Sequence, residues 1–144
     1  ATPGKSRLLT CFRMNDQGGL VELPGYGFAK AAKTDKFDFN EMVGDYLEQR
    51  ENLRRVFVLI DSRHKPQQID LDFISWLENT GAPFSLIFTK ADKQSPAKTR
   101  AVISLFQETL AQVVQSDPEV LVSSSLDRSG RDEILRSIQR SMEM

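Results

Sequence analysis

The sequence predicts an α/β fold with a mostly parallel sheet, chiefly because three short apolar runs alternate with helical segments. The runs are residues 56–60, 84–88 and 120–122. Unbroken apolar runs are typical of strands buried on both faces of a parallel sheet, and strands that alternate with helices indicate βαβ units. The chain has 144 residues, of which 40% are hydrophobic and 27% charged, so we expect a single globular domain over residues 1–144.

A β-hairpin is predicted for the first part of the chain. Residues 7–14 have the pattern of a half-buried strand, residues 15–19 form a turn cluster of Asn, Asp, Gln and two Gly, and residues 20–23 return as a second strand. A loop rich in glycine and lysine follows over residues 24–36.

Helices are predicted where apolar side chains recur at spacings of three and four residues. This periodicity is present in residues 37–52, in residues 69–77, in a long segment from Ser95 to Val114, and from about residue 132 to residue 142. Ser95-Pro96 marks the start of the long helix, because proline fits the first helical turn, where no N–H is needed. Helices and strands therefore alternate from residue 37 onward.

The composition excludes several classes of protein. With one cysteine, Cys11, the chain forms no internal disulfide, and we expect a reducing, cytoplasmic location. No apolar run approaches the roughly 20 residues of a membrane span, and residues 1–7 lack the layout of a signal peptide. A net charge of −1 argues against binding nucleic acid through bulk charge, and leaves local basic patches open.

The candidate site residues follow the apolar runs, because parallel α/β sheets bind ligands beyond the carboxyl ends of their strands. Gly25 lets a backbone amide approach a phosphate closely; the alternative is a plain tight turn. In Thr89-Lys-Ala-Asp92, the Asp92 carboxylate can accept two N–H donors from a guanine edge while the Lys90 stem lies along the ring. The alternative there is a solvated loop in which Asp92 caps the next helix.

Two further segments carry weaker signals. Ser123-Ser-Ser-Leu126 offers hydroxyls and amides to a ring carbonyl, and is equally compatible with a helix cap. His64, in Asp61-Ser-Arg-His-Lys-Pro66, has no second ligand at metal spacing and no nucleophile beside it, so a structural or surface role is favoured. Each segment is ambiguous alone, but their order along the chain is specific.

In that order the segments resemble the EngB (YihA/YsxC) family of bacterial ribosome-biogenesis GTP-binding proteins. The resemblance covers essentially the whole chain and depends on four motifs: Thr2-Pro-Gly-Lys5, Leu23-Pro-Gly-Tyr-Gly-Phe-Ala-Lys30, Leu59-Ile-Asp-Ser-Arg-His-Lys-Pro66 and Thr89-Lys-Ala-Asp92. It implies the P-loop NTPase fold of the translation-factor class, a three-layer sandwich with one antiparallel strand at the edge of the sheet. It also implies GTP or GDP and Mg²⁺ as cofactors.

The resemblance assigns phosphate and metal roles to residues near the start of the chain. Thr2 matches the switch I threonine that binds Mg²⁺, and Gly25 matches the switch II glycine whose amide contacts the γ-phosphate. Glu22 stands where the family has an aspartate near the metal, a departure with a longer side chain. Tyr26 occupies the place where many GTPases have a water-orienting glutamine, so we expect slow hydrolysis.

The resemblance assigns guanine recognition to the end of the chain. Thr89, Lys90 and Asp92 match the Asn/Thr-Lys-x-Asp motif, in which Asp92 selects GTP over ATP. Ser124 and Ser125 align with the loop whose backbone contacts the guanine carbonyl. Asp61, Arg63 and His64 match a family hallmark to which the sequence alone assigns no chemical role.

The phosphate-binding loop is the largest departure from the family pattern. No Gly-x-x-x-x-Gly-Lys-Ser/Thr is present in the 144 residues, and Gly4-Lys5-Ser6 is followed by a strand pattern rather than a helix. We therefore expect the first strand, the P-loop and the first helix, on the order of 30 residues, to precede residue 1. Without them we expect unpaired strand edges inside the sheet, little independent stability and no turnover.

The sequence thus predicts a slow GTPase switch that acts in assembly of the large ribosomal subunit, with a family-implied role in bacterial cell division. Expected partners are guanine nucleotide and the large subunit or its precursor, with no membrane, and the protein is expected to be a monomer. The alternative is a non-hydrolysing module that binds ribosomal RNA through Lys30, Lys33 and Lys36, with Arg50, Arg54 and Arg55 as further candidates. Ordinary solvated faces are the other interpretation of these charges. A small-molecule-binding α/β domain unrelated to GTP is the third hypothesis.

Overall fold

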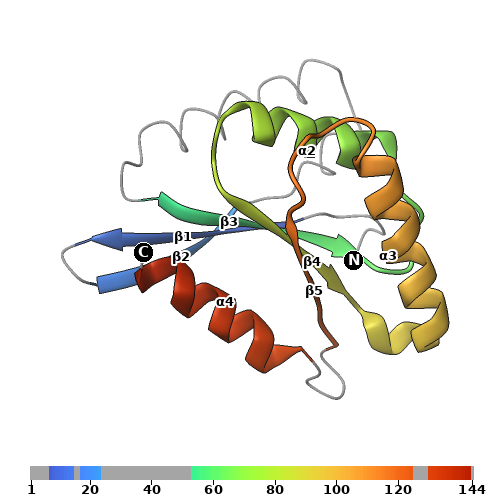
Figure 1. Cartoon of the computed structure of the whole chain (residues 1–144). Helices are drawn as coiled ribbons and strands as arrows, with labels where there is room; N and C mark the ends of the chain where they lie inside the picture. The colour runs from blue at the N-terminus through green and yellow to red at the C-terminus, as the bar shows by residue number, and fades with distance from the viewer. Residues whose placement is uncertain (1–6, 15–16, 24–52, 125–129, 144) are drawn as a thin grey trace.

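The computed structural model describes residues 7–14, 17–23, 53–124 and 130–143, which form one five-stranded sheet with helices on both faces (Figure 1). The strands are β1 (Arg7–Met14), β2 (Gln17–Leu23), β3 (Leu53–Asp61), β4 (Phe84–Thr89) and β5 (Glu119–Val122). The helices are α2 (Gln68–Asn79), α3 (Pro96–Leu110), α4 (Arg131–Glu143) and the short 3₁₀ helix η2 (Ala91–Lys93). The helix predicted over residues 37–52 lies outside the described residues.

The sheet confirms the predicted α/β class. Its strand order is β2-β1-β3-β4-β5, and β3, β4 and β5 are parallel, with Asp61 level with Thr89 and Val58 level with Leu86. These are the three apolar runs of the sequence, and each is followed by a helix. The βαβ connections bring the carboxyl ends of all three strands to one edge of the sheet.

The hairpin differs from expectation in its position and its boundary. β1 is antiparallel to both β2 and β3, so the antiparallel strand lies second from the edge rather than at the edge. The expected unpaired edge beside β3 is absent from the described strands, because β1 pairs there and satisfies the backbone groups of β3. β2 begins at Gln17, so Gly18 and Gly19 lie in the strand and not in the turn.

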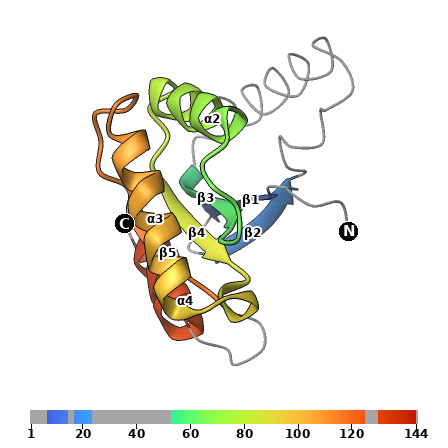
Figure 2. The same ribbon diagram turned by 90° about the vertical axis from the view of Figure 1, so that its right-hand side faces the viewer.

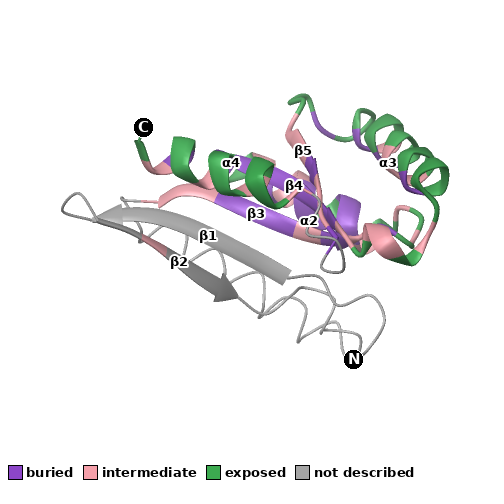
Figure 3. Cartoon of the chain, turned by 90° about the horizontal axis from the view of Figure 1, so that it is seen from below, coloured by how far each residue is buried: buried purple, intermediate pink, exposed green. Residues whose placement is uncertain are grey.

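The helices divide between the two faces of the sheet and produce the three predicted layers (Figure 2). Alternate residues of β3 point to opposite faces: Val56 and Val58 pack with α2 and α3, whereas Phe57 faces α4. Figure 3 shows the buried centre of the sheet between exposed helix surfaces. The larger core contains Ile74 and Phe106, which are fully buried.

Two helix boundaries follow from local chemistry. The Ser95 side chain accepts a hydrogen bond from the Lys98 amide and Pro96 occupies the first turn, as the sequence predicts for the start of α3. The helix ends at Leu110, earlier than the apolar stripe to Val114 indicates, and Val114 is buried beyond the helix end. Among the described residues, no helix has the length and apolar character to cross a bilayer.

A polar seam, formed by Arg55, Ser85, Glu119, Ser137 and Ser141, joins α4 to the sheet. Glu119 Oε1 accepts hydrogen bonds from Ser85 Oγ at 3.0 Å and from Ser137 Oγ at 2.6 Å. Arg55 donates through Nε to Ser141 Oγ at 3.0 Å. Ser85, Ser137 and Ser141 are buried, so this helix packs through hydrogen bonds as well as apolar contacts.

We predict that the polar seam makes stability depend on pH. Burial raises the pKa of the Glu119 carboxyl, but hydrogen bonds from Ser137 and Ser85 outweigh burial and bring that pKa below its usual value. A carboxyl whose pKa is lowered by folding stabilises the protein above its unfolded-state pKa of about 4.3, and this contribution is lost as the pH falls. Glu119→Gln should therefore lower the free energy of unfolding by about 1 kcal/mol at pH 7, measured by urea denaturation.

The difference between Glu119→Gln and the parent chain should shrink when the titration is repeated at pH 3. Glu143→Gln, at the exposed end of α4, is the control and should change stability by less than about 0.5 kcal/mol at either pH. A Glu119→Gln effect that is the same at pH 3 and pH 7 would contradict this account.

Candidate functional site

The loops that follow β3, β4 and β5 are tied to one another by backbone hydrogen bonds. The Ser62 amide donates to Thr89 O at 2.9 Å, and the Ser123 amide donates to Phe88 O at 2.8 Å. The Ala91 amide donates to Ser123 O at 3.1 Å. Two of the segments predicted to carry the site, residues 89–92 and the segment that begins at Ser123, are therefore linked to each other and to the loop after β3 at one edge of the sheet.

Asp92 lies in this surface on η2, with its side chain only 7% exposed. Ser124 Oγ donates a hydrogen bond to Asp92 Oδ1 at 2.9 Å, and Lys93 Nζ lies 3.8 Å from Asp92 Oδ2. Ser124 is itself buried. The structure thus brings two of the predicted site residues, Asp92 and Ser124, into direct contact, while Ser125 lies outside the described residues.

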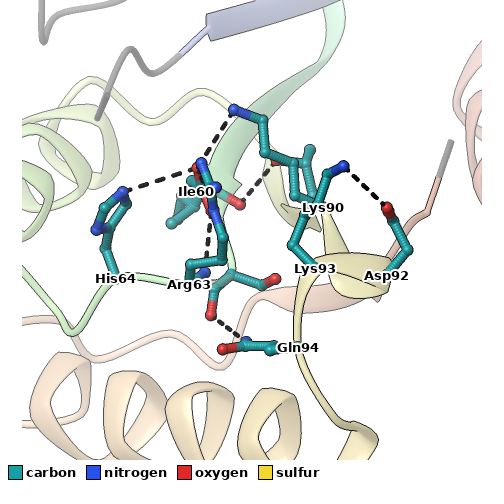
Figure 4. A network of polar contacts seen from close by, with 10 residues as sticks. Ile60, Arg63, His64, Lys90, Asp92, Lys93 and Gln94 are labelled. Carbon is teal, nitrogen blue, oxygen red and sulfur yellow. Dashed lines mark hydrogen bonds and ion pairs between the residues drawn. The ribbon is translucent and has the colours of Figure 1, made fainter. Parts of the chain in front are cut away.

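Lys90 has a left-handed backbone, with φ 61° and ψ 36°. A residue with a Cβ adopts this conformation at an energetic cost of the order of 1–3 kcal/mol, and such residues cluster at functional sites. Among the described residues it is the only non-glycine residue with positive φ. The turn directs the Lys90 side chain away from its own strand and toward the end of β3 (Figure 4).

The carboxylate of Asp61, the last residue of β3, is contacted by the cationic side chains of Arg63 and Lys90. Arg63 donates through Nε to Asp61 Oδ1 at 3.0 Å and through Nη2 to Oδ2 at 2.7 Å, and the Arg63 amide also donates to Oδ1 at 3.0 Å. Lys90 Nζ lies 3.3 Å from Asp61 Oδ2, and His64 Nε2 lies 3.7 Å from the same oxygen. Burial raises the pKa of the Asp61 carboxyl, but hydrogen bonds from Arg63 and Lys90 outweigh it and hold that pKa well below its usual value. Asp61 is therefore ionised throughout the neutral pH range.

Gln94, at the border of this site, was not predicted from the sequence. Its Nε2 donates to Ser62 O at 2.7 Å and to Thr99 Oγ1 at 3.1 Å, which joins the loop after β3 to the first turn of α3 (Figure 4). A glutamine before a helix cap carries no sequence signal of such a role, since its partner lies 32 residues away.

The residues predicted to contact phosphate and metal are only partly placed. Thr2, Gly25 and Tyr26 lie outside the described residues. Glu22 lies in β2 opposite Leu9. Because β1 is antiparallel to both β2 and β3, β2 runs in the same direction as β3 and ends toward the same edge of the sheet as Asp61. No group of three or more His, Cys, Asp and Glu side chains suited to a metal is present in the part of the chain that the structure describes.

Comparison with known proteins shows strong similarity to one family. The chain is 43% identical over 136 residues to "Probable GTP-binding protein EngB" of Cytophaga hutchinsonii, covering 94% of this chain and 68% of that protein. It is also 43% identical over 139 residues to the protein of the same name from Bacteroides thetaiotaomicron, covering 96% of this chain and 69% of that protein. No protein-family model matches the chain.

The fold is similar to that of Era, solved in complex with MgGDPNP and nucleotides 1506–1542 of 16S ribosomal RNA. The TM-score is 0.64 and the sequence identity 18%, and the match covers 94% of this chain but 44% of the Era chain. At this low identity, the comparison shows that the two folds are similar and nothing more. The sequence relatives carry the family assignment, since their identity exceeds 40% over nearly all of this chain. The chain belongs to the EngB family of GTP-binding proteins.

Proposed function

We propose that this chain binds the guanine base of GTP and GDP at the carboxyl edge of β3, β4 and β5. The observation that carries the proposal is the Asp92 carboxylate, held by Ser124 at 2.9 Å in a Thr-Lys-x-Asp sequence at the end of a buried parallel strand. An ionised carboxylate has about four lone-pair sites. The Ser124 hydroxyl uses one, which leaves acceptors for the ring N–H and the amino group of guanine.

This arrangement supports selection of guanine over adenine. Guanine presents two N–H donors on the edge that faces a carboxylate, whereas adenine presents a ring nitrogen acceptor there. A site that holds a polar group for one hydrogen-bond pattern rejects the other strongly, because the wrong ligand leaves that group unpaired. The Lys90 stem supplies an apolar surface for the flat face of the base.

We further propose that residues outside these 144 supply the phosphate-binding loop. The sequence contains no Gly-x-x-x-x-Gly-Lys-Ser/Thr, and the chain covers about two thirds of the length of its EngB relatives. Gly25 is proposed to contact the γ-phosphate, and Thr2 and Glu22 are the residues that the family assigns to Mg²⁺. The described side chains hold no metal cluster of their own, so the proposal for the metal depends on Thr2 and Glu22 alone.

The cellular role is a slow GTPase switch in assembly of the large ribosomal subunit, with a role in cell division. Membership of the EngB family supports the switch, and Tyr26 in place of a water-orienting glutamine supports slow hydrolysis. A cytoplasmic monomer with the large subunit or its precursor as partner completes the proposal. The alternative of a non-hydrolysing RNA-binding module depends first on Lys30, Lys33 and Lys36, which, like Arg50, lie outside the described residues. Its other candidates, Arg54 and Arg55, lie in β3, where Arg55 is engaged in the polar seam.

Titration of the full-length protein with fluorescent GDP and ATP analogues, with and without Mg²⁺, tests the proposed function. We expect micromolar or tighter GDP binding, no ATP binding, and tighter GTP binding when Mg²⁺ is present. The 144-residue chain alone, measured in parallel with its mass verified, should bind far more weakly because the phosphates lack their loop. Equal affinity of the full-length protein for GDP and ATP would refute the proposal.

A further inference from the structure

We propose that Asp61 is a positioning residue for the guanine base, because it anchors the Lys90 side chain across the edge of the sheet. The inference rests on the proposed function, and it gives the Asp61-Ser-Arg-His hallmark a physical role. Lys90 belongs to the loop after β4 and Asp61 ends β3, yet Lys90 Nζ lies 3.3 Å from Asp61 Oδ2. The Lys90 stem therefore spans from one strand end to the next beside Asp92.

The backbone around Lys90 determines the direction in which its side chain leaves the loop. Asp61 is level with Thr89 in the parallel register, and Thr89 Oγ1 donates to Ile60 O at 3.3 Å. The left-handed turn at Lys90 follows immediately. These contacts fix both ends of the stem, its Cα through the strand pairing and its ammonium group through the carboxylate.

A purely local role for Asp61 explains only part of its contacts. Its Oδ1 accepts from the Arg63 amide and side chain, which is sufficient to close the turn after β3. Its Oδ2 accepts from Arg63 Nη2 and lies near His64, both of the same turn, but it also faces Lys90, which comes from the loop after β4. The Asp61 side chain is 7% exposed and that of Lys90 is 46% exposed, so the ion pair is partly shielded from water.

The charge balance makes the Lys90 position depend on Asp61. Arg63 and Lys90 both approach Oδ2, at 2.7 Å and 3.3 Å. Without a negative charge between them, the two cations repel each other, and the more exposed Lys90 side chain is free to swing into solvent. The base would then lose the fixed apolar surface beside Asp92.

A double-mutant cycle on the full-length protein tests this coupling, with the dissociation constant for GDP measured by calorimetry. Asp61→Asn keeps the size of the side chain and an acceptor for the Arg63 amide. We expect it to weaken GDP binding about tenfold in the parent protein and less than twofold in the Lys90→Met background. Equal factors in the two backgrounds, or no weakening in the parent protein, would overturn the proposal.

Two control variants separate positioning from general structural damage. Arg63→Gln removes the other cation and leaves the Asp61–Lys90 pair, so GDP affinity should change less than twofold; a tenfold loss would overturn the proposal. Asp132→Asn, an exposed carboxylate at the start of α4, should leave GDP affinity unchanged. If Asp61→Asn does not fold, the same cycle is measured with Asp61→Ser, which also removes the charge and keeps an oxygen acceptor, and coupling to Lys90 below twofold would overturn the proposal.

Failure of this inference is distinguishable from failure of the proposed function. Suppose that the parent protein binds GDP and not ADP, but that the effect of Asp61→Asn is the same with and without Lys90. The guanine site would then be supported, and only the anchoring role of Asp61 would be refuted. A parent protein with no preference for GDP would refute the guanine site itself.

Discussion

Replacing Asp92 with asparagine should weaken GDP binding of the full-length protein about 100- to 1,000-fold. The carboxylate accepts both N–H donors of the guanine edge in the proposed site, and each hydrogen bond to a charged group contributes about 1.5–3 kcal/mol. Asparagine offers one acceptor and one donor instead, so its amide N–H would face the guanine amino group. The two losses together correspond to two or three orders of magnitude in the dissociation constant.

The same variant should gain affinity for xanthosine diphosphate. Xanthine carries a carbonyl where guanine carries its amino group, so the amide N–H of the introduced asparagine would donate to it while the amide oxygen accepts the ring N–H. Ser124 donates to Oδ1, which asparagine retains, so the local fold should persist. Competition titrations measure the ratio of the dissociation constants for GDP and xanthosine diphosphate in the parent protein and in Asp92→Asn, with Asp132→Asn as the control. Unchanged GDP affinity in Asp92→Asn would show that the base binds elsewhere.

Gly130→Ala should cost at least about 3 kcal/mol of unfolding free energy, because backbone strain and a steric overlap with β5 combine there. Gly130 has φ +80°, a conformation that side chains with a Cβ rarely adopt, and an added Cβ would meet Val122 O at 1.7 Å and Val122 C at 2.9 Å. Both atoms belong to the backbone of β5, so the strand itself would have to move. Because Ser123 and Ser124 directly follow Val122, GDP affinity should fall together with stability.

Gly81→Ala is the matched control for Gly130→Ala. Gly81 also has φ +80°, but nothing lies within 4 Å of an added Cβ, so the substitution costs only the backbone strain of about 1–2 kcal/mol. Urea denaturation of both variants separates strain from steric overlap. Equal losses at the two glycines would contradict the close approach of Gly130 to β5.

The sequence predicted those parts of the fold that depend on local pattern. The apolar runs became β3, β4 and β5, and the Ser95-Pro96 start of α3 is confirmed because capping needs only neighbouring residues. The position of β1 could not be predicted in the same way. The pairing of β1 with β3 joins segments more than 40 residues apart. The hydrophobic pattern of a hairpin also does not determine which of its two strands pairs with the rest of the sheet.

The candidate site was predicted through its motifs but not through its interactions. Asp92 and Ser124 were singled out as separate segments, and the structure shows that one donates to the other. The Asp61–Lys90 ion pair escaped prediction because it depends on the parallel register that sets Asp61 level with Thr89. Thr2, Gly25 and Ser125 lie outside the described residues, and the position of Glu22 in β2 does not test a metal role, so these remain predictions.

The helices on the two faces of the sheet should detach from it by local unfolding at different free energies. Among the described residues, the core cluster that packs α2 and α3 against the sheet has thirteen buried apolar side chains, whereas the α4 side has three, supplemented by the buried serines of the polar seam. Elements held by few buried apolar contacts unfold locally at the lowest free energy. The amides of α4 should therefore exchange with deuterium before those of β3 and β4. Gly130 immediately precedes α4 and lies against β5, so each detachment of the helix loosens the backbone that presents Ser124 to Asp92. Heating would then erode the proposed selectivity for guanine at temperatures where the α2–α3 half of the molecule is still folded.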